Sequence, residues 1–144
     1  MRTVKTALTD EAILACRDVI LTLRPHVDPE QLLTQIREMQ QEGYRLLYLT
    51  ADEDPDRVVA FAGYRHKHNL HSGRFIYIDD LATLSEYRAK GYASLLLYHI
   101  REIAREEGFS IVQLDSGHGL WPAHRLYHEQ GFYISAHHFT QKVS

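Results

Sequence analysis

The sequence has one cysteine, Cys16, and no long run of apolar residues. A single cysteine excludes an internal disulfide and a zinc site built from cysteines, and it fits a reducing compartment. No apolar stretch approaches the ~18 residues of a membrane-spanning helix. The first residues, Met-Arg-Thr-Val-Lys-Thr, lack the apolar core of a signal peptide. We therefore expect a cytoplasmic protein with no membrane partner.

The chain also lacks an excess of positive charge. Lys and Arg number 16 and Asp and Glu number 19, which gives a formal net charge of −3. Binding to a nucleic-acid backbone relies on clustered positive charge, so no nucleic-acid partner is expected. Hydrophobic residues make up 44% and charged residues 24% of the 144 residues, as in ordinary globular proteins. This length suits one domain, which we expect to span residues 1–144.

The spacing of apolar residues predicts an α/β fold with the element order ααβββαβαβ. Helices are expected over residues 10–24, with Thr9 as the N-cap, 28–42, 91–107 and 122–130. Strands are expected over residues 44–50, 57–65, 74–83, 111–115 and 132–140, with a connection over 66–73. The first two strands read as an antiparallel hairpin around the turn at residues 51–56.

The segment Arg88-Ala-Lys-Gly91-Tyr-Ala93 lies where a predicted strand is followed by a predicted helix. The first turn of a helix has unpaired N–H groups and partial positive charge. Gly91 has no Cβ, so a ligand could approach its backbone closely, and Arg88 and Lys90 add positive charge. These features are typical of a phosphate-binding loop, although an ordinary strand-to-helix turn also explains the glycine. The spacing matches neither Gly-x-Gly-x-x-Gly nor a Walker loop.

Together with a second motif, this segment resembles the GCN5-related N-acetyltransferase (GNAT) family. The pyrophosphate loop of that family reads Gln/Arg-x-x-Gly-x-Gly/Ala, and this chain has Arg88-x-x-Gly91-x-Ala93. The family's later motif, Ala-x-x-Leu-Tyr-x-x-x-Gly-Phe, is matched by Ala123-His-Arg-Leu-Tyr127-His-Glu-Gln-Gly-Phe132. The resemblance covers about residues 44–139, with a predicted strand and helix between the motifs.

The resemblance implies a mixed, mostly antiparallel sheet flanked by helices and splayed between two parallel central strands, here residues 74–83 and 111–115. It implies acetyl-CoA as co-substrate, bound in the opening between those strands. The residues that would match the family's cofactor-binding positions are Leu81, Ala82, Thr83, Arg88, Ala89, Lys90, Gly91, Tyr92, Ala93 and Ser94. The family often has an Asn where this chain has Leu120, so the cofactor contact at that point is lost or rebuilt.

The resemblance also assigns a catalytic role to Tyr127, which matches the tyrosine that protonates the departing CoA thiolate; a core tyrosine on an amphipathic helix is the alternative. An amine must lose a proton to attack a thioester, so a base or a proton wire is needed. Asp80 is the favoured base, with Asp115 and Asp79 behind it, and a structural carboxylate is the alternative for Asp80. Adjacent strand residues point to opposite faces unless a bulge intervenes, which would separate Asp79 from Asp80.

The acceptor side of the site is expected to include Asp79, His118 and Trp121. The acidic residues favour a cationic acceptor, such as a polyamine, an amino sugar or a lysine-bearing peptide. His124 and His128 lie four residues apart on one predicted helix, a spacing that can bind metal. Solvated or packed histidines are the more ordinary interpretation of the ten in the chain, and no metal is expected.

The predicted function is therefore an N-acetyltransferase that moves acetyl from acetyl-CoA to a primary amine of a small molecule or peptide by direct attack in a ternary complex. A covalent acyl-cysteine route is unattractive because Cys16 lies in the first predicted helix, far from the motifs. A non-catalytic CoA-binding sensor or partner-binding module with the same fold is one alternative, and a histidine-rich metal-binding protein is another. The acceptor is not specified, and a homodimer formed through residues 133–139 is left open.

Overall fold

The computed structural model describes residues 1–116 and 121–144. His118, Leu120 and the side chain of Trp121, which the sequence singled out, lie outside the described residues. The chain forms two compact units, Met1–Leu114 and Asp115–Ser144. Within the described part of the chain, every helix is too short or too polar to cross a membrane.

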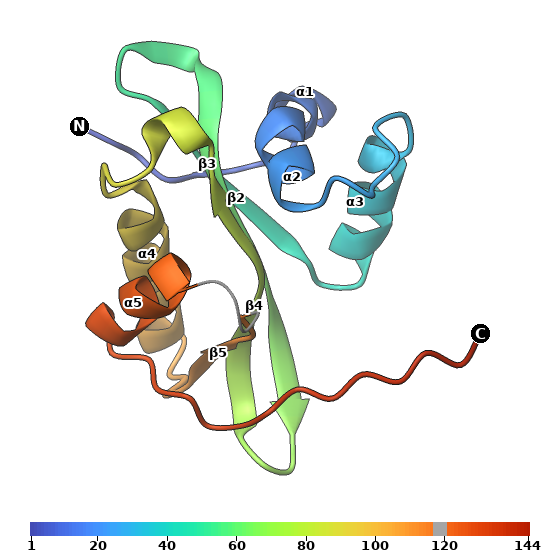
Figure 1. Cartoon of the computed structure of the whole chain (residues 1–144), viewed down its shortest axis with the longest axis vertical. Coiled ribbons are helices and arrows are strands. Elements are labelled where there is room, and N and C mark those ends of the chain that lie inside the picture. The colour runs from blue at the N-terminus through green and yellow to red at the C-terminus, as the bar shows by residue number, and fades with distance from the viewer. Residues whose placement is uncertain (117–120) are drawn as a thin grey trace. The chain divides into compact units, whose positions relative to one another are not determined.

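The first unit contains a five-stranded sheet with helices on both of its faces (Figure 1). Its strands are β1 (Lys5–Thr6), β2 (Arg45–Ala51), β3 (Asp54–Asn69), β4 (Gly73–Thr83) and β5 (Val112–Leu114). Its helices are α1 (Asp10–Ala15), α2 (Arg17–Leu23), α3 (Leu32–Gln41) and α4 (Tyr92–Glu106), with the short 3₁₀ helix η1 (Ser85–Tyr87) before α4. The strand order is β1-β2-β3-β4-β5, antiparallel except for the parallel pair β4–β5, and the predicted α/β fold with a mixed sheet is confirmed.

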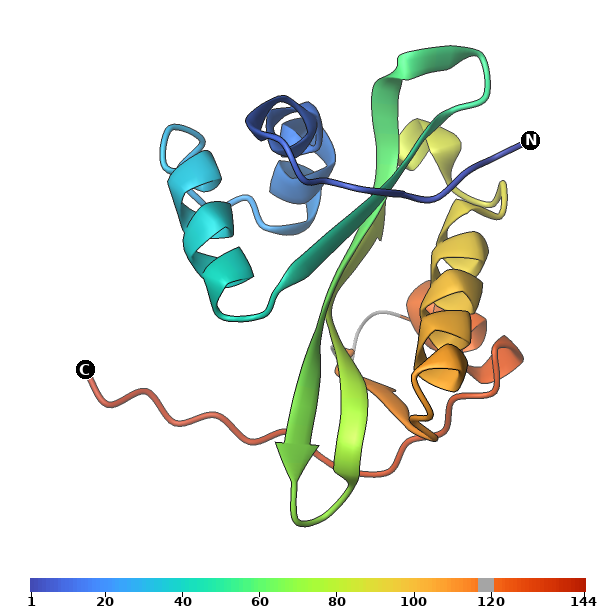
Figure 2. The same ribbon diagram turned by 180° about the vertical axis from the view of Figure 1, so that it is seen from behind.

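The core of this unit lies between the sheet and its two helical layers. Helix α2 packs against β3 and β4 on one face, and α4 packs against the same strands on the other (Figure 2). Fully buried side chains from both layers and from the strands between them include Ile13, Val19, Phe61, Ile76, Leu96 and Ile100. Burial of one such side chain contributes about 1.5–3 kcal/mol, so this packing holds β4 firmly in place.

The first predicted helix is divided in two. The Thr9 hydroxyl accepts a hydrogen bond from the Ala12 amide at 3.1 Å, which confirms the predicted N-cap. The helix then breaks at Cys16, which ends α1 and begins α2. Cys16 is fully buried, and burial raises the pKa of its thiol to about 12. The thiol is therefore protonated at neutral pH and behaves as a small apolar core group.

The second predicted helix begins four residues later than expected, at Leu32 rather than at Asp28. The Asp28 carboxylate accepts a hydrogen bond from the Glu30 amide at 3.0 Å, two residues along the chain. Such a side-chain contact favours a turn over a helix. The capping-box pattern at residues 28–31 therefore forms a local turn before α3.

The predicted connection over residues 66–73 is wrong for most of its length, since β3 continues to Asn69 and β4 begins at Gly73. Paired residues run along the whole hairpin, down to Asn69 opposite Gly73. The Asn69 side chain accepts a hydrogen bond from the Ser72 amide at 2.8 Å and closes the turn. Polar residues such as those at 66–68 form a strand here because the neighbouring strand supplies their hydrogen bonds.

The second unit contains helix α5 (Trp121–Glu129) followed by an irregular segment. The Phe132 amide donates to the Tyr127 carbonyl at 2.9 Å just past the end of the helix. The predicted last strand over residues 132–140 is wrong, because these residues form an irregular segment. Tyr133 is 81% exposed and Phe139 is 91% exposed. Their apolar alternation is typical of a strand, but a strand also needs a hydrogen-bonded neighbour, and no ladder among the described residues includes this segment.

Candidate active site

The parallel strands β4 and β5 pair over only a short distance. Ile76–Ile78 lie opposite Val112–Leu114, where β5 ends. β4 continues to Thr83, so its residues 79–83 extend past the last paired residue of β5. The edge of β4 beyond Ile78 is thereby open on the β5 side within the first unit, and it includes the predicted cofactor contacts Leu81, Ala82 and Thr83.

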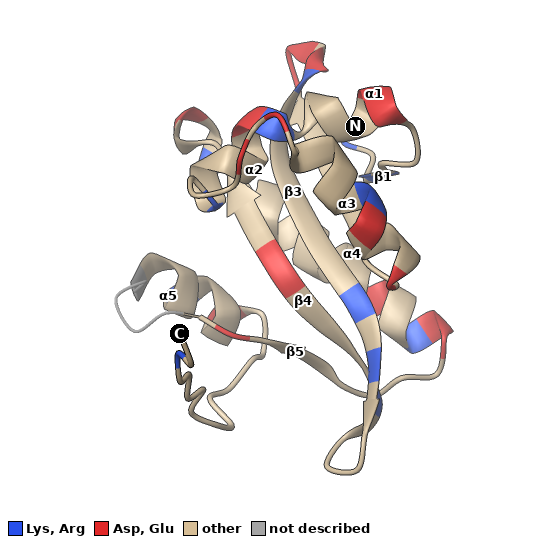
Figure 3. Ribbon diagram, turned by 90° about the vertical axis from the view of Figure 1, so that its right-hand side faces the viewer, with Lys and Arg blue, Asp and Glu red and all other residues tan. Residues whose placement is uncertain are grey.

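A β-bulge in β4 lies at the start of this open edge. Gly63 of β3 pairs with Asp80, whereas the next residue, Tyr64, pairs with Ile78, so Asp79 is an extra residue on β4. A bulge locally bends and re-aims the strand. Strict alternation of side chains therefore does not hold for Asp79 and Asp80, the two acidic residues that appear as a red band midway along β4 in Figure 3.

Asp80 is held by two neighbours from distant parts of the first unit. Arg24 Nε donates to its Oδ1 at 3.0 Å and the Tyr44 hydroxyl donates to its Oδ2 at 2.8 Å. The Asp80 side chain is 13% exposed. Burial raises the pKa of Tyr44 well above its usual value, and the negative charge of Asp80 raises it further, so the phenol stays protonated as a donor.

Asp79 has an arginine of its own. Arg65 Nε donates to the Asp79 carboxylate at 2.6 Å, and Arg24 Nη2 donates to the Asp79 carbonyl at 3.0 Å. Arg24 thus contacts both residues of the bulge. The side chains that meet at the bulge are Arg24, Tyr44, Arg65, Asp79 and Asp80.

No motif or spacing in the sequence indicates the three partners Arg24, Tyr44 and Arg65. One signal was present, because a glycine inside a strand often marks a close approach by another group. Gly63 is such a residue: a Cβ built on it would lie 1.7 Å from the Tyr44 hydroxyl oxygen. The Tyr44 side chain therefore reaches Asp80 across a position that has room only for glycine.

This contact predicts that Gly63→Ala lowers the free energy of unfolding by about 2 kcal/mol, the typical cost of overpacking a core. The added methyl group must displace the Tyr44 ring, which also breaks the hydrogen bond to Asp80. Urea denaturation of both proteins measures the change. The cost should shrink in a Tyr44→Ala background, where the ring is absent, and an equal cost in both backgrounds would contradict the explanation.

Residues 88–94, the predicted pyrophosphate loop and called so below, comprise the turn before α4 and the first residues of α4. Gly91 is the N-cap of α4 and has φ +86°. Ala89 has φ +60° and is the one non-glycine residue with positive φ in the described parts of the chain. Left-handed residues before a helix turn successive N–H groups toward one side, which makes an anion-binding concavity. The amides of Tyr92, Ala93 and Ser94 follow, ahead of Leu95, whose amide donates to the Gly91 carbonyl at 3.1 Å.

Two of the remaining candidates lie in the second unit. Tyr127 lies on α5, with its ring edge-to-face against Phe132 at a centroid distance of 5.9 Å. Burial raises the pKa of the Tyr127 phenol, so it is protonated at neutral pH and can donate a proton. Asp115 is half exposed, and its Oδ2 lies 3.4 Å from His138 Nδ1.

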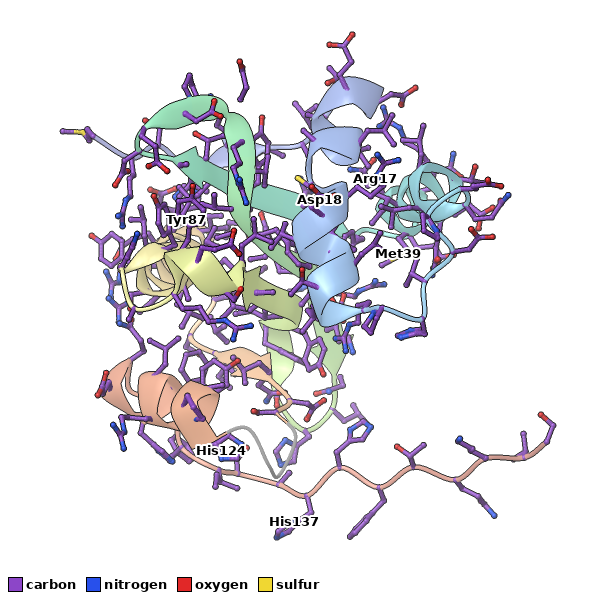
Figure 4. The ribbon with its side chains drawn as sticks, turned by 45° about the horizontal axis from the view of Figure 1, so that its top comes forward. Arg17, Asp18, Met39, Tyr87, His124 and His137 are labelled. Atoms are coloured by element: carbon purple, nitrogen blue, oxygen red, sulfur yellow. The ribbon has the colours of Figure 1, made fainter. Side chains whose placement is uncertain are left out.

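The second unit also contains several of the ten histidines. Figure 4 labels His124 on α5 and His137 on the C-terminal segment. In the residues that the structure describes, no three His, Cys, Asp or Glu side chains form a group that could hold a metal ion.

Comparison with known proteins identifies the class of protein. Residues 13–132 match the model of the acetyltransferase (GNAT) family. YhdJ, an uncharacterised N-acetyltransferase of Bacillus subtilis (strain 168), is 32% identical over 127 residues, which cover 87% of each protein. The chain therefore belongs to the acetyltransferase (GNAT) family, and the resemblance based on the two motifs is confirmed.

Solved structures share the fold at low sequence identity. A transcriptional regulator from Bacillus halodurans C-125 superposes with a TM-score of 0.84 at 18% identity, over 99% of each chain. AAC(6')-Iy in complex with the bisubstrate analog CoA-S-monomethyl-acetylneamine superposes with a TM-score of 0.84 at 13% identity, over 100% of this chain and 99% of that one. At these identities the likeness shows the fold alone.

Proposed function

We propose that this protein is a cytoplasmic, acetyl-CoA-dependent N-acetyltransferase with a single catalytic domain over residues 1–144. It transfers acetyl to a primary amine of a small molecule or peptide by direct attack in a ternary complex. The observation that carries the proposal is the pyrophosphate loop in a chain of this family, with left-handed residues at the N-terminus of α4. The complex of AAC(6')-Iy, an aminoglycoside N-acetyltransferase, with the bisubstrate analog CoA-S-monomethyl-acetylneamine supports both the co-substrate and a small-molecule acceptor.

The residues of the first unit fit the co-substrate. We propose that the amides of residues 89–94, with Arg88 and Lys90, hold the pyrophosphate. An anion there gains both from unpaired amides and from the helix dipole. The backbone of Leu81, Ala82 and Thr83, on the open edge of β4, holds the pantetheine arm and the acetyl group.

The chemical step exchanges a C–S bond for a C–N bond. The neutral amine attacks the acetyl carbonyl and the thiolate leaves with the bonding electron pair. Tyr127 donates its phenolic proton to the thiolate sulfur, and Asp80 takes the proton that the amine loses, with Asp115 and Asp79 as the other candidate bases. Positioned proton transfer of this kind contributes typically 10²–10⁴-fold to a rate.

Asp80→Asn should lower turnover at pH 7 about tenfold, because it removes the proton acceptor and keeps the size of the side chain. Turnover should partly recover at higher pH, where more of the amine is already neutral. The measurement is a pH profile of kcat. Asp10→Asn is the matched control, since it also disrupts an ion pair between an aspartate and an arginine, Arg37, outside the candidate site and should leave the profile unchanged. If Asp80→Asn has wild-type turnover at every pH, the base is Asp115, Asp79 or a water chain instead.

The function is tested by mixing the purified protein with acetyl-CoA and a panel of amines and measuring the free thiol of released CoA. The panel includes polyamines, amino sugars and lysine peptides. It also includes amines without a second charged group and amines that carry an acidic group. Arg24 and Arg65 pair with Asp80 and Asp79, and they offset the negative charge that favoured a cationic acceptor. Thiol release with one class of amine supports the enzyme. CoA binding without release for any amine would instead support the non-catalytic sensor.

A further inference from the structure

Arg2, on the segment before β1, joins two parts of the first unit that are far apart in sequence. Its guanidinium binds the Asp52 carboxylate through two hydrogen bonds, from Nε to Oδ1 and from Nη2 to Oδ2, both at 3.0 Å. Its remaining nitrogen, Nη1, donates to the Lys90 carbonyl at 2.6 Å. Asp52 lies in the turn between β2 and β3, and Lys90 lies in the pyrophosphate loop. One side chain therefore connects this turn to the loop.

Tyr92, the first residue of α4, also contacts Arg2. Arg2 Cζ lies 3.8 Å from the centroid of the Tyr92 ring, close enough for a cation–π contact. Tyr92 is 2% exposed, and its hydroxyl accepts a hydrogen bond from the Asp52 amide at 3.2 Å. Arg2 is itself only 25% exposed. It is thus fixed on three sides, and its position relative to the loop is well defined.

A second aromatic ring supports the same loop from the segment before it. Tyr87, labelled in Figure 4, lies on η1, and its ring meets the Tyr92 ring edge-to-face at 6.1 Å. The Tyr87 hydroxyl donates to Glu53 Oε1 at 2.6 Å, in the same β2–β3 turn that holds Asp52. The turn therefore serves as the anchor to which Arg2 and Tyr87 both attach.

The contact with Lys90 has a consequence for the neighbouring amide. A trans peptide is planar, with its C=O and N–H pointing in opposite directions. Because the Lys90 carbonyl is directed at Arg2, the Gly91 N–H is directed away from Arg2. A Cβ built on Gly91 would lie 3.5 Å from Arg2 Nη1, so the guanidinium lies directly against the loop backbone.

We propose that Arg2 is a positioning residue for co-substrate binding, which holds the Lys90–Gly91 peptide so that the Gly91 N–H faces the pyrophosphate of CoA. This inference rests on the proposed function. Arg2 acts through the backbone rather than as a direct phosphate ligand, because its positive charge is already paired with Asp52. Its effect should therefore appear only for ligands that carry the pyrophosphate.

The test is Arg2→Met, which keeps the length of the aliphatic side chain and removes all its hydrogen bonds. Calorimetry should show about tenfold weaker CoA binding, the scale of one hydrogen bond to a charged group. With an amine that the enzyme accepts, KM for acetyl-CoA should rise by a similar factor while kcat is retained. The kcat/KM for S-acetylpantetheine, which has no pyrophosphate, should stay within about twofold of wild type. Arg2→Lys should restore part of the CoA affinity, since an ammonium can still donate to the Lys90 carbonyl.

Arg37→Met is the matched control. Arg37, in α3, also pairs with an aspartate, Asp10, at 2.7 Å and donates to a backbone carbonyl, that of Leu8, at 3.2 Å. Its loss removes similar contacts elsewhere in the same unit, so CoA affinity should be unchanged. A melting temperature for each variant separates a folding defect from a binding defect. If Arg2→Met does not fold, the comparison is made with Arg2→Lys, which should bind CoA more weakly than wild type.

Three outcomes would overturn the inference about Arg2 alone: unchanged CoA affinity in the folded variant, an equal loss with S-acetylpantetheine, or an equal loss in Arg37→Met. Failure of the wild-type protein to bind CoA would instead overturn the proposed function and the role of Arg2 with it.

Discussion

Tyr127→Phe should lower kcat at least about tenfold, toward the ~10²–10⁴-fold range of general acid catalysis, with CoA affinity and melting temperature little changed. The substitution removes one oxygen and keeps the ring, so the edge-to-face contact with Phe132 at 5.9 Å survives. Burial raises the pKa of the phenol, which keeps its proton available for the leaving thiolate. The lower bound is modest because a thiolate leaves more easily than an alkoxide.

Initial rates of thiol release at saturating acetyl-CoA measure this effect. Tyr133→Phe is the matched control: it removes the same oxygen from a tyrosine of the same unit that is 81% exposed, and the rate should not change. A Tyr127→Phe protein that loses stability but keeps its rate would identify Tyr127 as a core tyrosine. Unchanged rate and stability would mean that the motif does not carry catalysis at this position.

Gly91→Val should weaken CoA binding about a hundredfold, a loss of ~2.7 kcal/mol. Gly91 has φ +86°, a conformation that a β-branched residue adopts only at a cost of about 1–3 kcal/mol. The loop must therefore rearrange, and the amides of residues 89–94 lose their common direction. The new side chain also meets Arg2, since its Cβ would lie 3.5 Å from Nη1. Calorimetry with CoA on the folded variant measures the change.

Gly108→Val controls for strain alone. Gly108 lies beyond the other end of α4 with φ +79°, and a Cβ there would meet no atom within 4 Å. This variant should lose stability for the same conformational reason and bind CoA as wild type does. Unchanged CoA affinity in Gly91→Val, or an equal loss in Gly108→Val, would refute the role of the pyrophosphate loop.

Features that depend on residues a few positions apart could be predicted from the amino-acid sequence alone. The N-cap at Thr9, the glycine at the start of α4 and the two motifs that indicate the family are all local patterns. Such features depend on backbone dihedral preferences and on hydrogen bonds within one turn, which a short segment of sequence specifies. The class of protein followed from them, because the motifs and their order are properties of the chain.

The side chains that surround Asp80 and the pyrophosphate loop could not be predicted from the sequence, because they come together only in the folded chain. Arg24 and Tyr44 lie 56 and 36 residues from Asp80, and Arg2 lies 88 residues from Lys90. The contacts of Arg24 and Tyr44 with Asp80 depend on the register of β3 against β4 and on the bulge at Asp79, because a shift of one residue would re-aim every side chain along the strand. The same reason explains the errors at residues 66–73 and 132–140: apolar alternation describes one strand, whereas a strand exists only when another chain segment pairs with it.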